Sequence, residues 1–248
     1  SSQPGTRCNR HCQDGEEKHA YAMAENILTE TCPNGLAVVT IDRPKALNSC
    51  TLPMVEGIRE TLRAWRDDVT VKAVLLKGNG GRAFCSGGDV KGCRETLMED
   101  PASPAPADLV FCEYNLLFEM EFLQKPSVAI AEGVTMGFGL GLASFCRYTV
   151  ATDTTRMAMP ESNIGLFPDV GFSYRAANFL PPGVGRLLAV TGAHLLGVDE
   201  AVGSGLASHG IAGGRLPELE PRLRALDLSG DADGAVRACL AGLAAPPA

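Results

Sequence analysis

Three consecutive small residues, Ser86, Gly87 and Gly88, stand in the stretch Arg82-Ala83-Phe84-Cys85-Ser86-Gly87-Gly88-Asp89, which comes just after a strand-like run and a loop. Because Ser86, Gly87 and Gly88 carry little or no side chain, a ligand can approach the backbone closely there. Free N–H groups in this stretch, followed by a helix that opens at Asp89, are suited to hold an oxygen on which negative charge develops. The alternative is an ordinary glycine turn before a helix, and these residues alone leave both interpretations open.

A second glycine-rich stretch reads Glu132-Gly133-Val134-Thr135-Met136-Gly137-Phe138-Gly139-Leu140-Gly141. Its glycines suit a second backbone N–H donor at the start of a helix. They suit the close packing of a helix equally well. Taken by itself, the stretch does not separate the two roles.

Two carboxylates stand eight residues apart in a third stretch, which runs from Met159-Pro160-Glu161 to Phe167-Pro168-Asp169-Val170-Gly171. The surroundings are apolar and rich in glycine and proline, and an apolar environment raises the pKa of a carboxyl group. Such a group suits acid/base or nucleophilic chemistry. The alternatives are a solvated loop acid and an acid that caps a helix.

The composition is that of an ordinary globular protein, with 248 residues of which 45% are hydrophobic and 21% charged. This length suits one large domain, or one domain with a small appendage. No apolar run reaches the roughly 18 residues of a membrane-spanning helix, so no membrane partner is expected. The net charge of -7 argues against nucleic acid as a main partner, yet an anionic small molecule remains compatible with local basic and N–H groups.

The nine cysteines are an odd number at irregular spacings, which favours a reducing compartment over a disulfide framework. Cys8, His11 and Cys12 lie close together in the sequence. No second ligand pair follows at zinc-site spacing, so no metal site is predicted. A Ser–His–Asp triad is not indicated either, because the chain has no G-x-S-x-G elbow.

Strand-like runs alternate with helical patterns along most of the chain, which predicts an α/β fold. Residues 1–24 are polar without a period and are predicted to be a disordered arm. Asn34-Gly35 predicts a hairpin turn before a strand over 36–42. We expect further strands over 71–76, 127–131 and 148–151, helices from Leu52 to Trp65 and over 108–124, an exposed loop over 100–106, and two short helices within 216–243.

Together with the string Ile41-Asp42-Arg43-Pro44-Lys45-Ala46-Leu47-Asn48, the glycine-rich stretches resemble the crotonase (enoyl-CoA hydratase/isomerase) superfamily. The string is similar to the opening motif of that family, residues 82–89 to its first oxyanion-hole loop and residues 137–141 to its second. The resemblance covers about Asn34 to Gly210. It implies a crotonase-type spiral of repeated ββα turns over residues 25–215, with C-terminal helices over 216–248, and acyl-CoA thioester substrates.

Within the superfamily, the third stretch and Glu113-Tyr114 resemble 3-hydroxyisobutyryl-CoA hydrolases. Enoyl-CoA hydratases carry two catalytic glutamates, and Glu161 matches the second of them. Gly141 stands where the first would be, which argues against a hydratase because half of the acid/base pair is missing. Phe138 departs from the hydrolase pattern, which has glycine there.

The resemblance implies hydrolysis of a short-chain 3-hydroxyacyl-CoA, most closely 3-hydroxyisobutyryl-CoA to 3-hydroxyisobutyrate and CoA in valine catabolism. The N–H groups of Ser86 and Phe138 would stabilise the oxyanion. Glu161 would attack the thioester carbonyl or activate water, and Asp169 would position the substrate hydroxyl and Glu161. The expected substrate-binding residues are Glu113, Gly87, Gly88, Asp89 and Gly137.

Two alternatives stay open: a hydratase or isomerase of the same fold, and a non-catalytic crotonase-like fragment. No cofactor is implied, because coenzyme A is part of the substrate. The family usually forms trimers or hexamers, so a homo-oligomer is expected. A mitochondrial or cytoplasmic location is expected, and no acid-poor targeting segment is visible. The C-terminal segment is shorter than in the hydrolases.

Overall fold

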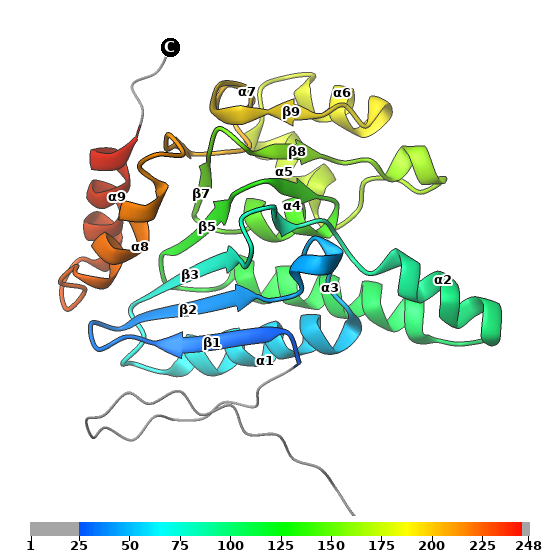
Figure 1. The fold of residues 1–248 in the computed structure, drawn as a ribbon, viewed down its shortest axis with the longest axis horizontal. Helices are drawn as coiled ribbons and strands as arrows, with labels where there is room; N and C mark the ends of the chain where they lie inside the picture. The colour runs from blue at the N-terminus through cyan, green and yellow to red at the C-terminus, as the bar shows by residue number, and fades with distance from the viewer. Residues whose placement is uncertain (1–24, 245–248) are drawn as a thin grey trace, which may run out of the picture.

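The computed structural model describes residues 25–244 and shows two β-sheets with helices packed around them (Figure 1). The predicted arm over residues 1–24 and the Cys8, His11 and Cys12 group lie outside the described residues. The sheets are built by a repeating pattern: after a first hairpin and helix within residues 27–67, three successive turns of the chain each add one strand to the larger sheet, one to the smaller sheet and then helix. This arrangement confirms the predicted α/β fold, a spiral of ββα turns.

The larger sheet is mainly parallel, in the order β1-β2-β3-β5-β7-β10. Only β1 runs antiparallel to its neighbour, through the hairpin that Asn34-Gly35 predicts. The strands of this larger sheet are β1 (Ile27–Thr31), β2 (Leu36–Ile41), β3 (Ala73–Gly78), β5 (Ser127–Ala131), β7 (Tyr148–Ala151) and β10 (His209–Gly210).

The smaller sheet has the order β4-β6-β8-β9, and its strands are only two or three residues long. They are β4 (Ala83–Cys85), β6 (Val134–Met136), β8 (Arg156–Ala158) and β9 (Leu195–Leu196). The pairs β4–β6 and β6–β8 are parallel, so the carboxyl ends of these three strands share one edge. All three glycine- and proline-rich stretches of the sequence leave a strand at this edge.

The helices expected from Leu52 to Trp65, over 108–124 and within 216–243 are present with shifted ends, whereas the three helices within residues 172–203 were not predicted. The helix expected over 108–124 begins earlier, because Pro106 is tolerated in a first helical turn and the loop is therefore shorter than predicted. The helices are α1 (Leu52–Asp67), α2 (Val90–Glu99), α3 (Ala105–Glu121), α4 (Phe138–Ser144), α5 (Phe172–Phe179), α6 (Val184–Thr191), α7 (Gly197–Gly203), α8 (Leu216–Arg224) and α9 (Ala232–Leu243).

Alternate residues of the larger sheet bury its two faces in separate cores. Val39 and Leu76 belong to the core that α1 and α3 cover, whereas Val38 and Leu75 belong to the core that α8 and α9 cover (Figure 1). Successive side chains of a strand point to opposite faces, so both faces must be apolar for a sheet covered on two sides. The C-terminal helices therefore complete the second core.

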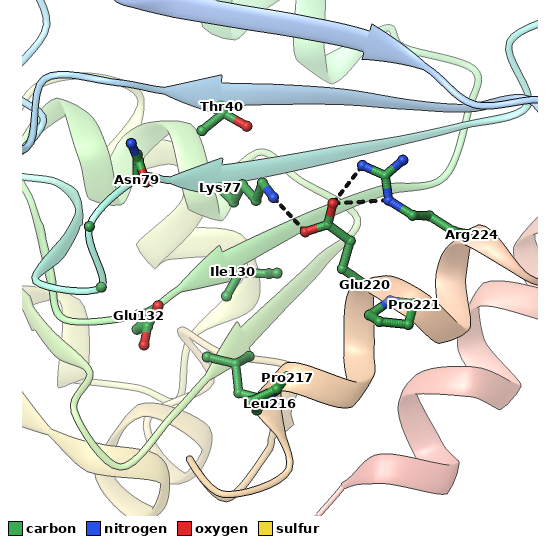
Figure 2. A pocket seen from close by; sticks show the side chains of 13 residues that line it. Thr40, Lys77, Asn79, Ile130, Glu132, Leu216, Pro217, Glu220, Pro221 and Arg224 are labelled. Carbon is green, nitrogen blue, oxygen red and sulfur yellow. Dashed lines mark hydrogen bonds and ion pairs between the residues drawn. The ribbon is translucent and has the colours of Figure 1, made fainter. Parts of the chain in front are cut away.

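A cavity of about 480 Å³ lies between α8 and the ends of β2, β3 and β5 (Figure 2). Its basic side chains are paired, since Lys77 and Arg224 both contact the carboxylate of Glu220. None of the predicted site residues lines it. The cavity is thus distinct from the edge at which the three sequence stretches meet.

Three further findings concern the described residues. All cysteines of residues 25–244 are free thiols, as the irregular spacing indicates. Over the same range, no cluster of three or more His, Cys, Asp or Glu side chains has an arrangement that could hold a metal ion. No helix between residues 25 and 244 is both long and apolar enough to cross a bilayer.

Asn48 joins the loop after β2 to the turn between β3 and β4. Its side chain is fully buried, accepts a hydrogen bond from Arg43 N (2.9 Å) and donates to Asn79 O (3.0 Å) and Ala83 O (2.7 Å). Its φ of 56° is left-handed, a conformation that asparagine tolerates better than most residues. One side chain thereby fixes the approach to the β4 loop.

We predict that Asn48→Ala lowers the free energy of unfolding by about 2–4 kcal/mol, because it leaves buried backbone groups without partners. Urea denaturation followed by circular dichroism measures the change. Asn178→Ala is the matched control, since Asn178 is exposed and bonds only Tyr174 O on its own helix. Equal, small effects of both substitutions would show that Asn48 does not fix this loop.

Candidate active site

The loop after β4 offers one unused backbone N–H. Ser86 N–H donates to Leu47 O (3.1 Å), Gly87 N–H to the sulfur of Cys85 (3.4 Å) and Asp89 N–H to Cys50 O (2.8 Å). Gly88 N–H has no acceptor among the described residues. The expectation that Ser86 supplies the donor is therefore corrected, because its amide extends the pairing of β4 with the 44–48 loop and Gly88 carries the available one.

Asp89 holds this loop through a hydrogen bond and an ion pair. Its side chain accepts a hydrogen bond from Gly92 N–H (3.1 Å) and so caps α2, while its second oxygen forms an ion pair with Arg43 (2.9 Å). Each carboxylate oxygen thus has a partner close to the loop. The structure thus gives Asp89 a role in holding the loop, whereas the sequence predicted substrate binding.

The turn between β6 and α4 supplies a second free N–H. Gly137 has a φ of 53° and donates to Ala158 O (3.2 Å), after which α4 starts at Phe138. The N–H groups of a first helical turn have no partner within the helix, and Phe138 N–H has none elsewhere among the described residues. The Phe138 side chain is 3% exposed and belongs to the main core, so the left-handed backbone falls on Gly137 and not on Phe138.

These two turns lie against each other. A Cβ atom placed on Gly137 would be 3.8 Å from Gly87 Cα, and one placed on Gly87 would be 3.8 Å from Phe138 N. These are ordinary van der Waals distances, and it is the positive φ of Gly87 (116°) and Gly137 (53°) that favours glycine at both positions. The Gly88 and Phe138 amides consequently belong to one small region, the arrangement required for two donors to one oxygen.

Glu161 lies directly beside this region, at the start of the short 3-10 helix η2 (Glu161–Ile164). Its Oε1 is 2.9 Å from the position of a Cβ on Gly137, and its Oε2 is buried without a hydrogen bond. Burial raises the pKa of Glu161 to about 7, and the charge of Asp169 adds to the effect. Near neutral pH this carboxyl group can therefore give up or accept a proton.

Glu113 reaches the same region from α3. Its Oε1 is 2.6 Å from the position of a Cβ on Gly88 and is buried without a partner. Burial raises the pKa of Glu113 to about 8, with further contributions from the charges of Asp169 and Glu161. Glu113 is therefore mainly protonated at neutral pH and can donate a hydrogen bond from its hydroxyl.

Asp169 follows η2 in a turn with an unusual backbone. Val170 has a φ of 39°, which is rare for a β-branched residue, and it is buried against Gly141. A Cβ on Gly141 would lie 2.9 Å from Val170 O and 3.0 Å from Val170 Cβ, so no side chain fits there. The Asp169 carboxylate accepts a hydrogen bond from the Tyr114 hydroxyl (2.8 Å).

The structure places Glu161, Glu113 and Asp169 beside the 87–88 and 137–138 turns. Sequence reasoning assigned no role to Tyr114, which lies 55 residues from its partner Asp169. It also gave none to Thr135, whose buried hydroxyl on β6 has no hydrogen-bond partner. The only sequence signal for Tyr114 is its place beside Glu113.

Two unused N–H donors and acids with raised pKa values suit one kind of chemistry. The donors can stabilise an oxygen that becomes negative when a carbonyl carbon is attacked. The neighbouring acids can transfer the protons that such a reaction moves.

Comparison with known proteins agrees with this geometry. The sequence pattern of the enoyl-CoA hydratase/isomerase family matches residues 36–248. The chain is 39% identical over 212 residues to the mitochondrial 3-hydroxyisobutyryl-CoA hydrolase of Gallus gallus, a match that covers 84% of this chain and 53% of that protein. It is 41% identical over 209 residues to the enzyme of the same name from Mus musculus, covering 83% and 52%. The chain spans about half the length of the curated relatives it matches.

Solved structures with the same fold include a carnitinyl-CoA dehydratase from Mycobacterium thermoresistibile, with a TM-score of 0.80 and 37% identity over 90% of this chain and 62% of that one. An enoyl-CoA hydratase from Rhodobacter sphaeroides 2.4.1 gives a TM-score of 0.74 and 30% identity, covering 86% and 66%. The family match spans most of the chain, and the fold and its glycine turns agree with it. The chain therefore belongs to the enoyl-CoA hydratase/isomerase (crotonase) family.

Proposed function

We propose that this site hydrolyses a short-chain 3-hydroxyacyl-CoA thioester, with 3-hydroxyisobutyryl-CoA as the leading substrate. The observation that carries the proposal is the unpaired Glu161 carboxyl beside the free amides of Gly88 and Phe138, at a site where residue 141 has no room for a second glutamate. The names of the chicken and mouse relatives support the same substrate.

In the proposed reaction, the thioester carbonyl oxygen accepts hydrogen bonds from Gly88 N–H and Phe138 N–H. Glu161 acts as a carboxylate in one of two ways. If it attacks the carbonyl carbon, the C–S bond breaks, the thiolate leaves and takes a proton from water, and a second water molecule hydrolyses the acyl–Glu161 anhydride to release the hydroxy acid and restore the carboxylate. If it removes a proton from the attacking water, the hydroxyl bonds to the carbonyl carbon, the C–S bond breaks, and the proton held by Glu161 passes to the coenzyme A sulfur. Side chains and water suffice for these steps, and coenzyme A belongs to the substrate.

Asp169 and Glu113 complete the proposed site. Asp169 accepts a hydrogen bond from the substrate hydroxyl, which an acyl group without that hydroxyl cannot replace. Glu113 stays protonated and donates within the polar network near Gly88. A mitochondrial location, supported by the names of the relatives, is part of the proposal.

A hydratase is the weaker candidate. Such an enzyme needs a second carboxylate on α4, and Val170 occupies the space beside Gly141. A chain that binds the thioester without turning it over is the other alternative, and the first experiment below distinguishes it.

We predict that Glu161→Gln slows thioester hydrolysis by at least about 100-fold while the fold is kept, because the group that must be ionised is lost. The parent protein should gain activity as pH rises through about 7, the pKa of Glu161, since the carboxylate form is the active one. A free-thiol release assay across pH measures both effects. The matched control is Glu132→Gln, which changes a glutamate in the separate cavity. Turnover of Glu161→Gln within threefold of the parent would assign the chemistry elsewhere.

Glu113 should make the protein less stable at high pH. Because the pKa of Glu113 rises from 4.5 to about 8 on folding, the folded state holds this proton more tightly than the unfolded chain. The stability gained is complete below the unfolded pKa and is lost as pH rises through the folded one. We predict that Glu113→Gln reduces the loss of unfolding free energy between about pH 5 and about pH 9 by on the order of a few kcal/mol.

Urea denaturation at the two pH values measures that loss. The matched control is Glu60→Gln, at an exposed glutamate of α1. If the Glu113→Gln variant kept the pH dependence of the parent, Glu113 would not be a buried acid in solution.

The exposed apolar face of α3 predicts self-association. Phe111 is 70% and Phe118 65% exposed, and their spacing puts them on the same helix face as Tyr114. The hydrogen bond from Tyr114 to Asp169 places this face beside the 164–167 segment, where Phe167 is also exposed. Contiguous apolar surface of this kind favours association.

We expect the protein to sediment as an oligomer, and we expect Phe118→Asp to shift it toward a monomer. Val69→Asp is the matched control, because Val69 is also highly exposed but lies in the turn after α1. A parent protein that sediments as a monomer over the whole concentration range would contradict the prediction.

A further inference from the structure

Two adjacent residues of α3 reach different parts of the site. Glu113 directs Oε1 toward Gly88, whereas the Tyr114 hydroxyl donates to Asp169 Oδ2 at 2.8 Å. Neighbouring residues of a helix differ by about 100° in direction, so one turn of α3 can hold both the β4 loop and the turn beyond η2. Tyr114 is thereby the link between α3 and Asp169.

We propose that Tyr114 is a positioning residue, which holds the Asp169 carboxylate in the orientation that recognises the hydroxyl of a 3-hydroxyacyl thioester. The inference rests on the proposed function, in which Asp169 accepts a hydrogen bond from that hydroxyl. It goes further because it names the Tyr114 hydroxyl as the group that holds Asp169 in place for this contact.

Asp169 needs such a support because the chain before it is poorly anchored. Residues 162–167 are all exposed, and a Cβ on Gly165 would meet nothing within 4 Å. The backbone becomes buried again at Pro168 and Val170, but this fixes only the main chain. Among the described residues, the Tyr114 hydroxyl is the one donor that the Asp169 carboxylate has.

Helix α3, by contrast, is a firm base for Tyr114. Its opposite side is buried in the main core through Leu109, Leu116 and Met120, where α3 packs on α1. A hydrogen bond from this helix therefore transfers the rigidity of the core to a side chain on an exposed turn. Tyr114 itself is partly exposed, so its contribution is the hydrogen bond more than the burial of its ring.

The chemistry of the pair leaves Asp169 free to bind a ligand. A tyrosine hydroxyl has one proton to donate, and Tyr114 gives it to Oδ2, so Oδ1 keeps its acceptor capacity. Burial and the hydrogen bond to Asp169 raise the pKa of Tyr114 to about 12, so the hydroxyl remains a donor at every pH of interest. A substrate hydroxyl can then donate to Oδ1, a contact that an acyl group without the hydroxyl cannot make.

The test measures hydroxyl discrimination by binding, in a Glu161→Gln background so that thioesters stay intact. Calorimetry gives the dissociation constants of 3-hydroxyisobutyryl-CoA and of isobutyryl-CoA, which lacks the hydroxyl. The parent should bind the hydroxy compound at least about tenfold more tightly, as for a hydrogen bond to a charged group. Tyr114→Phe should reduce this ratio to near one while leaving isobutyryl-CoA affinity unchanged.

Two further variants separate positioning from a general structural effect. Tyr174→Phe is the matched control on α5, where the ring packs against Phe179, and it should keep the full ratio. In an Asp169→Asn background, Tyr114→Phe should change nothing more, because the residue acts through Asp169.

A ratio that survives Tyr114→Phe, or equal losses for both thioesters, would overturn the inference. The inference would also be overturned if the parent bound 3-hydroxyisobutyryl-CoA no more tightly than isobutyryl-CoA, or if it bound neither thioester. If discrimination depends on Tyr114 while a parent with Glu161 intact releases no thiol from 3-hydroxyisobutyryl-CoA, the inference stands and the proposed hydrolysis fails.

Discussion

The direct packing of α4 on the end of β4 is the contact on which the site depends. A Cβ atom on Gly139 would overlap the carbonyl oxygen of Cys85, so the first turn of α4 rests on the backbone of β4 itself. Only glycine permits so short a distance between two main chains. A bulkier residue at this position would separate the Phe138 amide from the Gly88 amide, and one oxygen would no longer reach both.

A second constraint concerns the two buried acids beside the paired amides. Glu161 and Glu113 are 8% and 5% exposed, and neither forms an ion pair in the described residues. Burial without a counter-charge favours the neutral form of a carboxyl group, and the neighbouring charge of Asp169 strengthens this preference. The same packing that shapes the site thus sets the protonation of its acids close to neutral pH.

The replacement of a glutamate by Gly141 has a structural counterpart. Val170 fills the space that a side chain at position 141 would need, and it does so with a positive φ that costs conformational energy. Strain of this kind persists only where surrounding packing enforces it. The absence of a side chain at position 141 of α4 therefore allows the turn that carries Asp169 and Val170 to approach this helix.

Sequence reasoning found the elements whose signals are local. The strands Ser127–Ala131 and Tyr148–Ala151 are short, mostly apolar and fully buried, and their predicted ends match the structure. The short strands β6 and β8 were not predicted as strands, because three residues beside glycines look like a loop. The choice of Ser86 over Gly88 failed for a related reason, since the acceptor Leu47 lies on a distant segment that no local pattern reveals.

The acids of the site and the segments beside them differ in their access to solvent. The acids are buried by the spiral itself, so their raised pKa values need no further covering. The side of the site on which we propose that the acyl group binds is different, because residues 162–167 and the aromatic face of α3 are exposed to solvent. Electrostatic stabilisation weakens where water has access, and a polar contact at the open side discriminates only if something holds it in place. In the proposed reaction, the core sets the protonation of the acids, whereas selection of the substrate would depend on supports at the open side such as the Tyr114 hydroxyl.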